Sequence, residues 1–234
     1  MDELKSLKSL ITDYEINLSG QQLIDNNQSL LNFLGGLIET MSSGRYDIGR
    51  FKQLGQGNYS LVFDYDDSIA FKISSPKTIQ EHEGKHLAAE DLLIQFRVMN
   101  FLNDYFNRHD DQKIIAPEQF FALQLTNGTG IAFFEKIPWQ ALDTYITNQS
   151  FDDDQVVELN NLVKIEIKKR LNNPIIRMMM SDVRLKRYQY LNCNNILVND
   201  FDDLLDSTYC IIDQPGQNQL QAKIAYLIGY MLNL

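Results

Sequence analysis

The stretch QLGQGNYSLVFDYDDSIAFKIS, residues 53–74, carries the pattern on which the fold prediction rests. Gly55 and Gly57 lie two residues apart, and a backbone without Cβ atoms can approach a phosphate group closely. Val62 follows on the return strand, where a branched apolar side chain suits contact with a flat base. Ala70 and Lys72 lie two residues apart in the next apolar run, so both point to one face of a strand. The stretch therefore predicts a phosphate-binding hairpin followed by a strand with a lysine.

The composition is that of a globular chain. It has 234 residues, of which 44% are hydrophobic and 22% charged, and this suits one domain or two small lobes. No apolar run approaches the roughly 18–20 residues of a spanning helix, so we expect no membrane span. A formal net charge of −10 argues against nucleic-acid binding, which needs clustered Lys and Arg. Two cysteines, Cys193 and Cys210, make no disulfide framework and favour a reducing, cytoplasmic compartment.

Periodicity predicts N-terminal helices, a strand-rich middle and a helix-rich block after it. The predicted helices are residues 4–11, 23–41, 77–107, 141–146, 154–171, 175–188 and 219–232. The predicted strands are residues 46–54, 60–66, 68–74, 118–125, 131–137, 195–200 and 208–213. The sequence NGTG at 127–130 predicts a tight hairpin turn between two of these strands.

Several of these segments resemble parts of the protein kinases. LGQGNYSLVF (54–63) is similar to the glycine-rich loop of that family, AFKI (70–73) to its third-strand Ala-x-Lys, and YDIGRFKQLG (46–55) to its usual domain opening. The resemblance spans residues 46–216. It implies an α+β, two-lobed fold with a small antiparallel β lobe, one long helix and a reduced helical second lobe. It also implies that Lys72 contacts the α- and β-phosphates of ATP.

The resemblance divides the chain into three parts. Residues 1–45 would be an N-terminal helical extension, 46–137 the small lobe and 138–234 the reduced helical large lobe. The family pairs its strand lysine with a glutamate on the following helix, and Glu90, eighteen residues after Lys72, is our preferred partner. Glu83 and, by apolar phase, Gln95 are the alternatives.

IAFFEKIPWQALDTYI, starting at residue 131, is similar to the hinge between the kinase lobes. In that case Phe134 would be the gatekeeper, and backbone groups of Glu135 and Ile137 would face the adenine. An ordinary strand followed by a proline turn is the alternative interpretation.

YQYLNCNNILV and CIIDQPG resemble the catalytic loop and the Asp-Phe-Gly motif of the kinases. The resemblance implies that Asn195 and Asp213 bind Mg²⁺. Tyr190 stands where the family has its catalytic aspartate. Because an unperturbed tyrosine has a pKa near 10, it is a poor base at neutral pH. The resemblance therefore implies that Lys72, Asn195 and Asp213 hold ATP and its metal ion, while Tyr190 replaces the aspartate that would activate the hydroxyl group of a substrate.

Three hypotheses follow, and they leave open whether the chain is an enzyme. The first is a pseudokinase that binds a nucleotide and acts through a protein partner. The second is an atypical ATP-dependent phosphotransferase or nucleotidyltransferase, with Asp182 or a partner's acid as base. The third is a helical adaptor without a nucleotide, and in all three residues 1–44 would be the interaction surface. By analogy, the short large lobe also fits kinase-like effectors that bacterial pathogens deliver into host cells.

Overall fold

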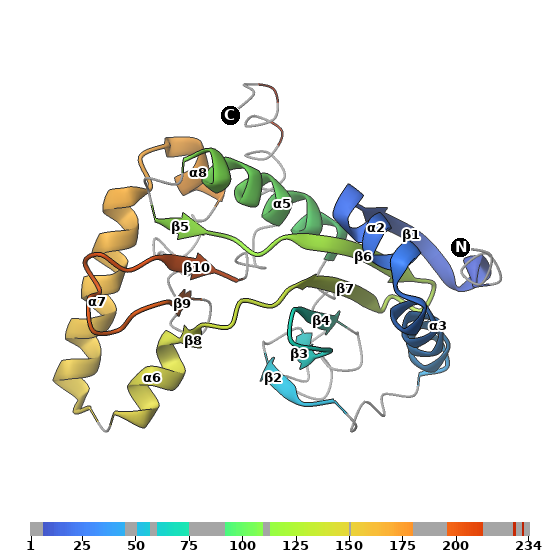
Figure 1. Ribbon diagram of the computed structural model, residues 1–234, viewed down its shortest axis with the longest axis horizontal. Helices are drawn as coiled ribbons and strands as arrows, with labels where there is room; N and C mark the ends of the chain where they lie inside the picture. Colours follow the sequence, from blue (N-terminus) through green and yellow to red (C-terminus); the bar gives the residue numbers. More distant parts are fainter. Residues whose placement is uncertain are drawn as a thin grey trace. The chain divides into compact units, whose positions relative to one another are not determined.

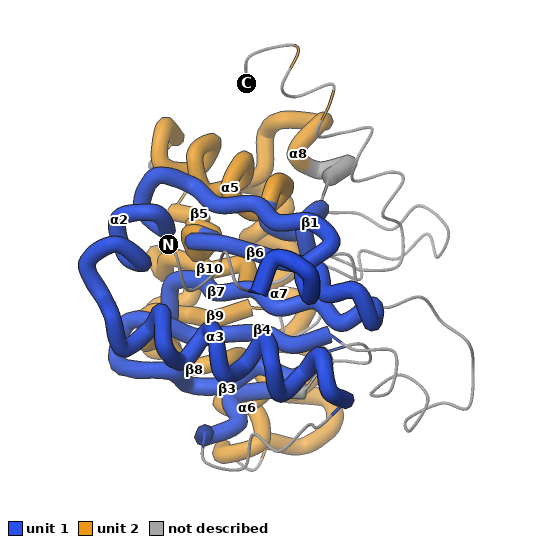
Figure 2. The backbone as a smooth tube through the Cα atoms, turned by 90° about the vertical axis from the view of Figure 1, so that its right-hand side faces the viewer, with its two compact units in different colours: residues 1–96, 119–136 blue, residues 97–118, 137–234 orange. Residues whose placement is uncertain are grey.

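The structure is a computed structural model, which describes residues 7–44, 51–56, 60–74, 92–109, 113–149, 151–179, 196–212, 227 and 231. The chain divides into two compact units (Figure 2): residues 1–96 with 119–136, and residues 97–118 with 137–234. Each unit has its own sheet, six-stranded in the first and four-stranded in the second (Figure 1). Together with the helices, these sheets make an α+β chain, which confirms the predicted class.

The six-stranded sheet is antiparallel throughout, in the order β1-β6-β7-β4-β3-β2. Its strands are β1 (Ile11–Ile16), β2 (Gln53–Gln56), β3 (Ser60–Asp64), β4 (Ile69–Ser74), β6 (Gln119–Leu125) and β7 (Gly130–Glu135). Four strands expected here from period-two alternation are confirmed, namely β3, β4, β6 and β7. The strand predicted over 46–54 overlaps β2 only at residues 53–54, and its residues 46–50 lie outside the described part of the chain. The predicted NGTG turn joins β6 to β7, with Gly128 at a φ of 84°, where glycine is favoured because it has no Cβ.

The sixth strand, β1, corrects one prediction. Residues 4–11 were expected to be helical, but Lys8–Leu10 form a short 3-10 helix, η1, and the chain then enters β1. β1 pairs with the outer edge of β6, with Ile16 opposite Phe121. The free N–H and C=O groups of a sheet edge are satisfied by an added strand. This long-range pairing outweighs the weak helical preference of the leucine repeat.

The predicted helix over residues 23–41 is two helices. α2 (Leu18–Asn26) ends just before Asn27, and α3 (Gln28–Ser42) begins just after it. The Asn27 side chain accepts a hydrogen bond from the Leu30 backbone N–H at 2.9 Å, which caps α3. The break occurs here because asparagine is among the best N-cap residues and satisfies a backbone donor at the helix start.

One face of the six-stranded sheet carries an aromatic core. Phe33 of α3 packs with ring centroids 4.8 Å from Phe51, 5.1 Å from Tyr65 and 5.3 Å from Phe71. Phe71 in turn stacks on Phe133 of the neighbouring strand at 5.4 Å. Because successive strand residues alternate between faces, residues next to Phe71 in β4 point to the opposite face.

That opposite face is contacted by the start of α5 (Leu92–Arg108), the described part of the helix predicted over 77–107. Residues 77–91 of that prediction lie outside the described part of the chain. The cluster on this face contains Leu92, Phe96, Ala122 and Ala132. Small residues from the sheet therefore meet large ones from the helix, and the two come close together.

The second unit is built on a sheet in the order β5-β10-β9-β8. Its elements are β5 (Ile114–Ile115), β8 (Gln140–Ala141), α6 (Leu142–Asn148), α7 (Asp153–Arg170), α8 (Pro174–Met179), β9 (Ile196–Val198) and β10 (Tyr209–Ile211). The predictions for α6, α7, β9 and β10 are confirmed. Most of the helix predicted over 219–232 lies outside the described residues.

Candidate functional site

A row of side chains crosses the helix-facing side of the six-stranded sheet. The register places Gly55 opposite Val62, Val62 opposite Lys72, and Lys72 opposite Ala132. Ala132 is in turn opposite Ala122. Directly opposed residues of antiparallel strands lie on the same face. The fold therefore places Gly55, Val62 and Lys72 on one face of the sheet, and Ala132 and Ala122 continue the same row.

Lys72 is almost fully buried, with 4% of its surface exposed. Its Nζ donates a hydrogen bond of 3.1 Å to Oε1 of Gln95 on α5, and Gln95 is itself 7% exposed. A buried ammonium is costly unless it is hydrogen-bonded. The helix thus supplies an acceptor that stabilises Lys72 inside the unit.

Gln95, which the apolar phase of α5 offered as an alternative partner, contacts Lys72 directly. The preferred partner, Glu90, lies outside the described residues, so its pairing with Lys72 stays a prediction. An amide oxygen accepts a hydrogen bond without carrying charge. The contact with Gln95 therefore supplies Lys72 with a hydrogen-bond acceptor and adds no charge of its own.

The residues expected to face an adenine lie around the end of β7. Ala70 is buried and opposite Phe134, and Ile69 is opposite Glu135. Phe134 and Glu135 are half-buried. Ile137, the first residue of the second unit after β7, is also half-buried. Ala70 shares the face of Lys72, and the ligand roles of all these residues stay predictions.

The remaining predicted site residues are Gly57, Glu90, Tyr190, Asn195 and Asp213, which lie outside the described residues. Within the described ranges, no group of three or more His, Cys, Asp or Glu side chains is arranged to hold a metal ion. The two expected Mg²⁺ ligands flank a described hairpin, since β9 begins one residue after Asn195 and β10 ends two residues before Asp213. Ile196 and Ile211 are opposite one another in that hairpin.

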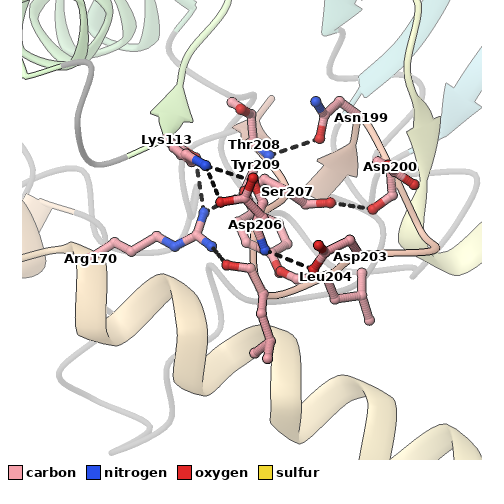
Figure 3. A network of polar contacts seen from close by, with 11 residues as sticks. Lys113, Arg170, Asn199, Asp200, Asp203, Leu204, Asp206, Ser207, Thr208 and Tyr209 are labelled. Atoms are coloured by element: carbon pink, nitrogen blue, oxygen red, sulfur yellow. Dashed lines mark hydrogen bonds and ion pairs between the residues drawn. The ribbon is translucent and has the colours of Figure 1, made fainter.

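The connection between β9 and β10 is held by a polar network centred on Arg170 (Figure 3). Its guanidinium donates hydrogen bonds to the carbonyl oxygens of Ser207 and Leu205, the latter at 2.6 Å. The same group lies 4.9 Å from the ring centroid of Tyr209. Lys113 forms an ion pair with Asp206 of this connection. The end of α7 therefore fixes the geometry of the hairpin.

Sequence reasoning missed this network. The run that ends in Arg170 has the pattern of a solvated helix face, and α7 is indeed a helix there. The planar guanidinium presents several donors in a fixed fork, which suits a cluster of backbone carbonyls. The carbonyls come from residues more than thirty positions away, and no local pattern marks such a pairing.

Two groups of the network have shifted pKa values. The hydrogen bond and charge of Lys113 lower the pKa of Asp206. Burial raises the pKa of Tyr209 to about 12, against the opposing effect of the Arg170 cation. The Tyr209 hydroxyl donates a 2.5 Å hydrogen bond to the Leu204 carbonyl, which requires the protonated form.

The raised pKa of Tyr209 predicts a loss of stability at high pH. In the unfolded chain a tyrosine ionises near pH 10. Below that pH the hydroxyl is protonated in both states, and the raised pKa of Tyr209 makes its full contribution to the free energy of unfolding. This contribution disappears as the pH rises from roughly 10 to the folded value of about 12. We expect the free energy of unfolding, measured by urea denaturation, to fall more steeply across this window for wild type than for Tyr209→Phe. Parallel pH profiles for the two proteins would contradict the prediction.

No protein-family model matches the chain, and no curated protein sequence is significantly similar to it. Among solved structures, the PknI kinase domain of Mycobacterium tuberculosis matches 70% of this chain and 57% of that one, at 14% identity and a TM-score of 0.36. A double mutant of that kinase domain matches 70% and 56%, at 16% identity and a TM-score of 0.37. APH(2")-IIia in complex with GDP and kanamycin matches 74% and 69%, at 12% identity and a TM-score of 0.32. The chain spans little more than half the length of the two PknI structures.

Proposed function

We propose that this chain is a kinase-like nucleotide-binding protein that holds ATP on the Lys72 face of the six-stranded sheet. The observation that carries the proposal is the strand register, which places the buried Lys72 on one face of the sheet with Val62 and Gly55. Lysines are almost never fully buried unless they are paired. An ammonium group in this row would attract a phosphate group.

Gly55 supports the same assignment. A Cβ atom added at Gly55 would meet no other atom within 4 Å, so packing inside the protein does not require a glycine there. Glycine inside a strand weakens the strand, and it often marks a place where a ligand approaches the backbone. Gly55 opposes Val62, which in turn opposes Lys72. A phosphate chain lying along this row would reach from the glycine backbone to the ammonium.

The base would lie beside Val62 and Ala70, which share the face of Lys72. Val62 is half-buried and Ala70 is buried, and both side chains are apolar, which suits contact with a flat ring. Backbone groups of Glu135 and Ile137 would supply the acceptor and donor that adenine needs. Mg²⁺, bound by Asn195 and Asp213, would neutralise part of the phosphate charge.

In this proposal the protein is a pseudokinase. Tyr190 replaces the carboxylate that would accept the proton of a substrate hydroxyl, and removing a positioned base typically costs about 10²–10⁴-fold in rate. Bound nucleotide would then act by stabilising a shape that a protein partner recognises. We propose a cytoplasmic location, since two cysteines in a chain of this length make no disulfide framework. Among the described residues, no helix is both long and apolar enough to cross a bilayer.

Nucleotide binding is tested by thermal stability. We expect ATP with Mg²⁺ to raise the melting temperature of wild type, since a ligand that binds only the folded state stabilises it by about 2.7 kcal/mol at a hundredfold excess over Kd. Lys72→Met keeps much of the side-chain volume and removes the charge, so the shift should shrink. Differential scanning fluorimetry and isothermal titration calorimetry measure the two effects.

Lys52→Ala is the matched control, because Lys52 is an exposed lysine in the same unit. Its ATP-dependent shift should equal that of wild type, which separates a loss of the Lys72 contact from a general change in charge. The absence of any thermal shift and of any calorimetric signal at millimolar ATP would rule out the proposed function.

A further inference from the structure

Helix α7 has one face buried in the second unit and another open to solvent. Val163, Glu166 and Ile167 are buried on the inner face. On the outer side, Val157 is 58%, Leu162 37% and Ile165 48% exposed. An aliphatic side chain that stays exposed to water does not contribute the favourable free energy that its burial would give. Three of them on the open side of one helix suggest a surface that is covered by another molecule.

The charges of α7 are divided between its ends. Asp153 and Asp154 lie in the first turn, and the last turn carries Lys168, Lys169 and Arg170. Arg170 is turned inward onto the Ser207 and Leu205 carbonyls, so the lysines form the outer basic end. Interaction with the helix dipole accounts for acids at the start and bases at the end. It does not account for the exposed aliphatic residues between them.

Asn161, which is exposed, lies at the centre of a complementary pattern. In four pairs of residues, one member precedes Asn161 in the sequence by as many positions as the other follows it. The pairs are Val157 and Ile165, Glu158 and Lys164, Asp154 and Lys168, and Asp153 and Lys169. All eight of these side chains are exposed or half-buried. Within these four pairs the apolar residue is matched by an apolar one and each acid by a lysine, while Leu162 is matched by Asn160.

We propose that the outer face of α7 is an interface between two copies of this chain, packed antiparallel about a two-fold axis at Asn161. A two-fold interface brings the same patch of both copies together, so a residue meets the one equally distant from the axis in the partner. Val157 of each copy then meets Ile165 of the other, and each acidic end meets the other copy's lysines. The two Asn161 amides meet on the axis, where each can donate to and accept from the other.

The interface is expected to be modest in strength. Exposed ion pairs contribute little each, so the affinity depends on the aliphatic centre, while the charges set the antiparallel orientation. A net charge of −10 on each chain opposes association. We therefore expect a dissociation constant of about 1–100 μM.

The first test is the oligomeric state of the full chain by sedimentation velocity over a concentration series reaching about 0.5 mM, well above that range. Wild type should pass from monomer to dimer, and Ile165→Glu should remain monomeric because it places a charge at the apolar centre. Asp202→Lys changes a charge on an exposed residue between β9 and β10 and should dimerise like wild type. A wild type that stays monomeric, or an Ile165→Glu variant that still dimerises, overturns the proposal.

The second test exchanges the charges. Asp154→Lys with Glu158→Lys makes both ends of α7 basic, and Lys164→Glu with Lys168→Glu makes both ends acidic. Each double variant alone should be monomeric, although the first carries less net charge than wild type and repels itself less. Mixed in equal amounts, the two should form a heterodimer with the same total charge as two wild-type chains.

Circular dichroism melting of each double variant checks that both fold. If only one of them folds, that variant must still be monomeric where wild type is dimeric. Two folded variants that fail to associate on mixing would contradict the antiparallel pairing. Dimerisation of either variant alone would contradict it equally.

Discussion

Replacing Phe71 with alanine is expected to lower the free energy of unfolding of the first unit by about 3–5 kcal/mol. Phe71 is fully buried, and its ring centroid lies within 5.4 Å of four other rings. These belong to Phe33, Phe51, Phe63 and Phe133. Truncation removes buried apolar surface, leaves a cavity and breaks the aromatic pairs, each of which contributes beyond its buried area.

Urea denaturation monitored by circular dichroism measures this effect. Tyr14→Ala is the matched control, because Tyr14 is an aromatic strand residue of the same unit that is largely exposed, and its loss should change stability little. Phe71→Leu should fall between wild type and Phe71→Ala, since it refills part of the cavity. Equal stabilities for Phe71→Ala and Tyr14→Ala would show that the ring cluster is not the core of the unit.

The second large effect is expected for Gly20→Ala. A Cβ atom at this position would lie 2.0 Å from the carbonyl oxygen of Phe120 and 2.6 Å from its carbonyl carbon. The two segments are tied together here, because the Asn17 backbone N–H donates to the Phe120 carbonyl at 3.1 Å. The first turn of α2 must therefore move away from β6. We expect Gly20→Ala to lower the free energy of unfolding by about 1–3 kcal/mol, the usual range for overpacking. The same urea denaturation curves measure this change.

Gly36→Ala supplies the opposite expectation in a neighbouring helix. A Cβ atom at Gly36 of α3 meets nothing within 4 Å. Alanine is favoured over glycine in a helix interior by about 1 kcal/mol, so this variant should be stabilised. If Gly20→Ala is as stable as wild type or more stable, the close approach of α2 to β6 is wrong, whereas a destabilised Gly36→Ala would contradict only the expectation for α3.

Local patterns were enough to predict most elements of the two sheets. Alternation over residues 60–74 and 118–137 predicted β3, β4, β6 and β7, and NGTG predicted the turn between β6 and β7. The spacing of Ala70 and Lys72 also predicted a shared face. These features depend on neighbours in the chain or on short hairpins, for which the period of the sequence specifies which side chains lie together.

The rest depended on residues distant in the chain. β1 became a strand because β6 had an edge to pair with, and Gln95 reached Lys72 because of where α5 crosses the sheet. Gly20 is required by the Phe120 carbonyl, and Arg170 turns inward because the carbonyls of Leu205 and Ser207 lie beside it. Tertiary contacts of this kind exceed the few tenths of a kcal/mol by which local propensities differ. No local pattern in the sequence predicts these contacts, because the two partners come together only when the chain folds.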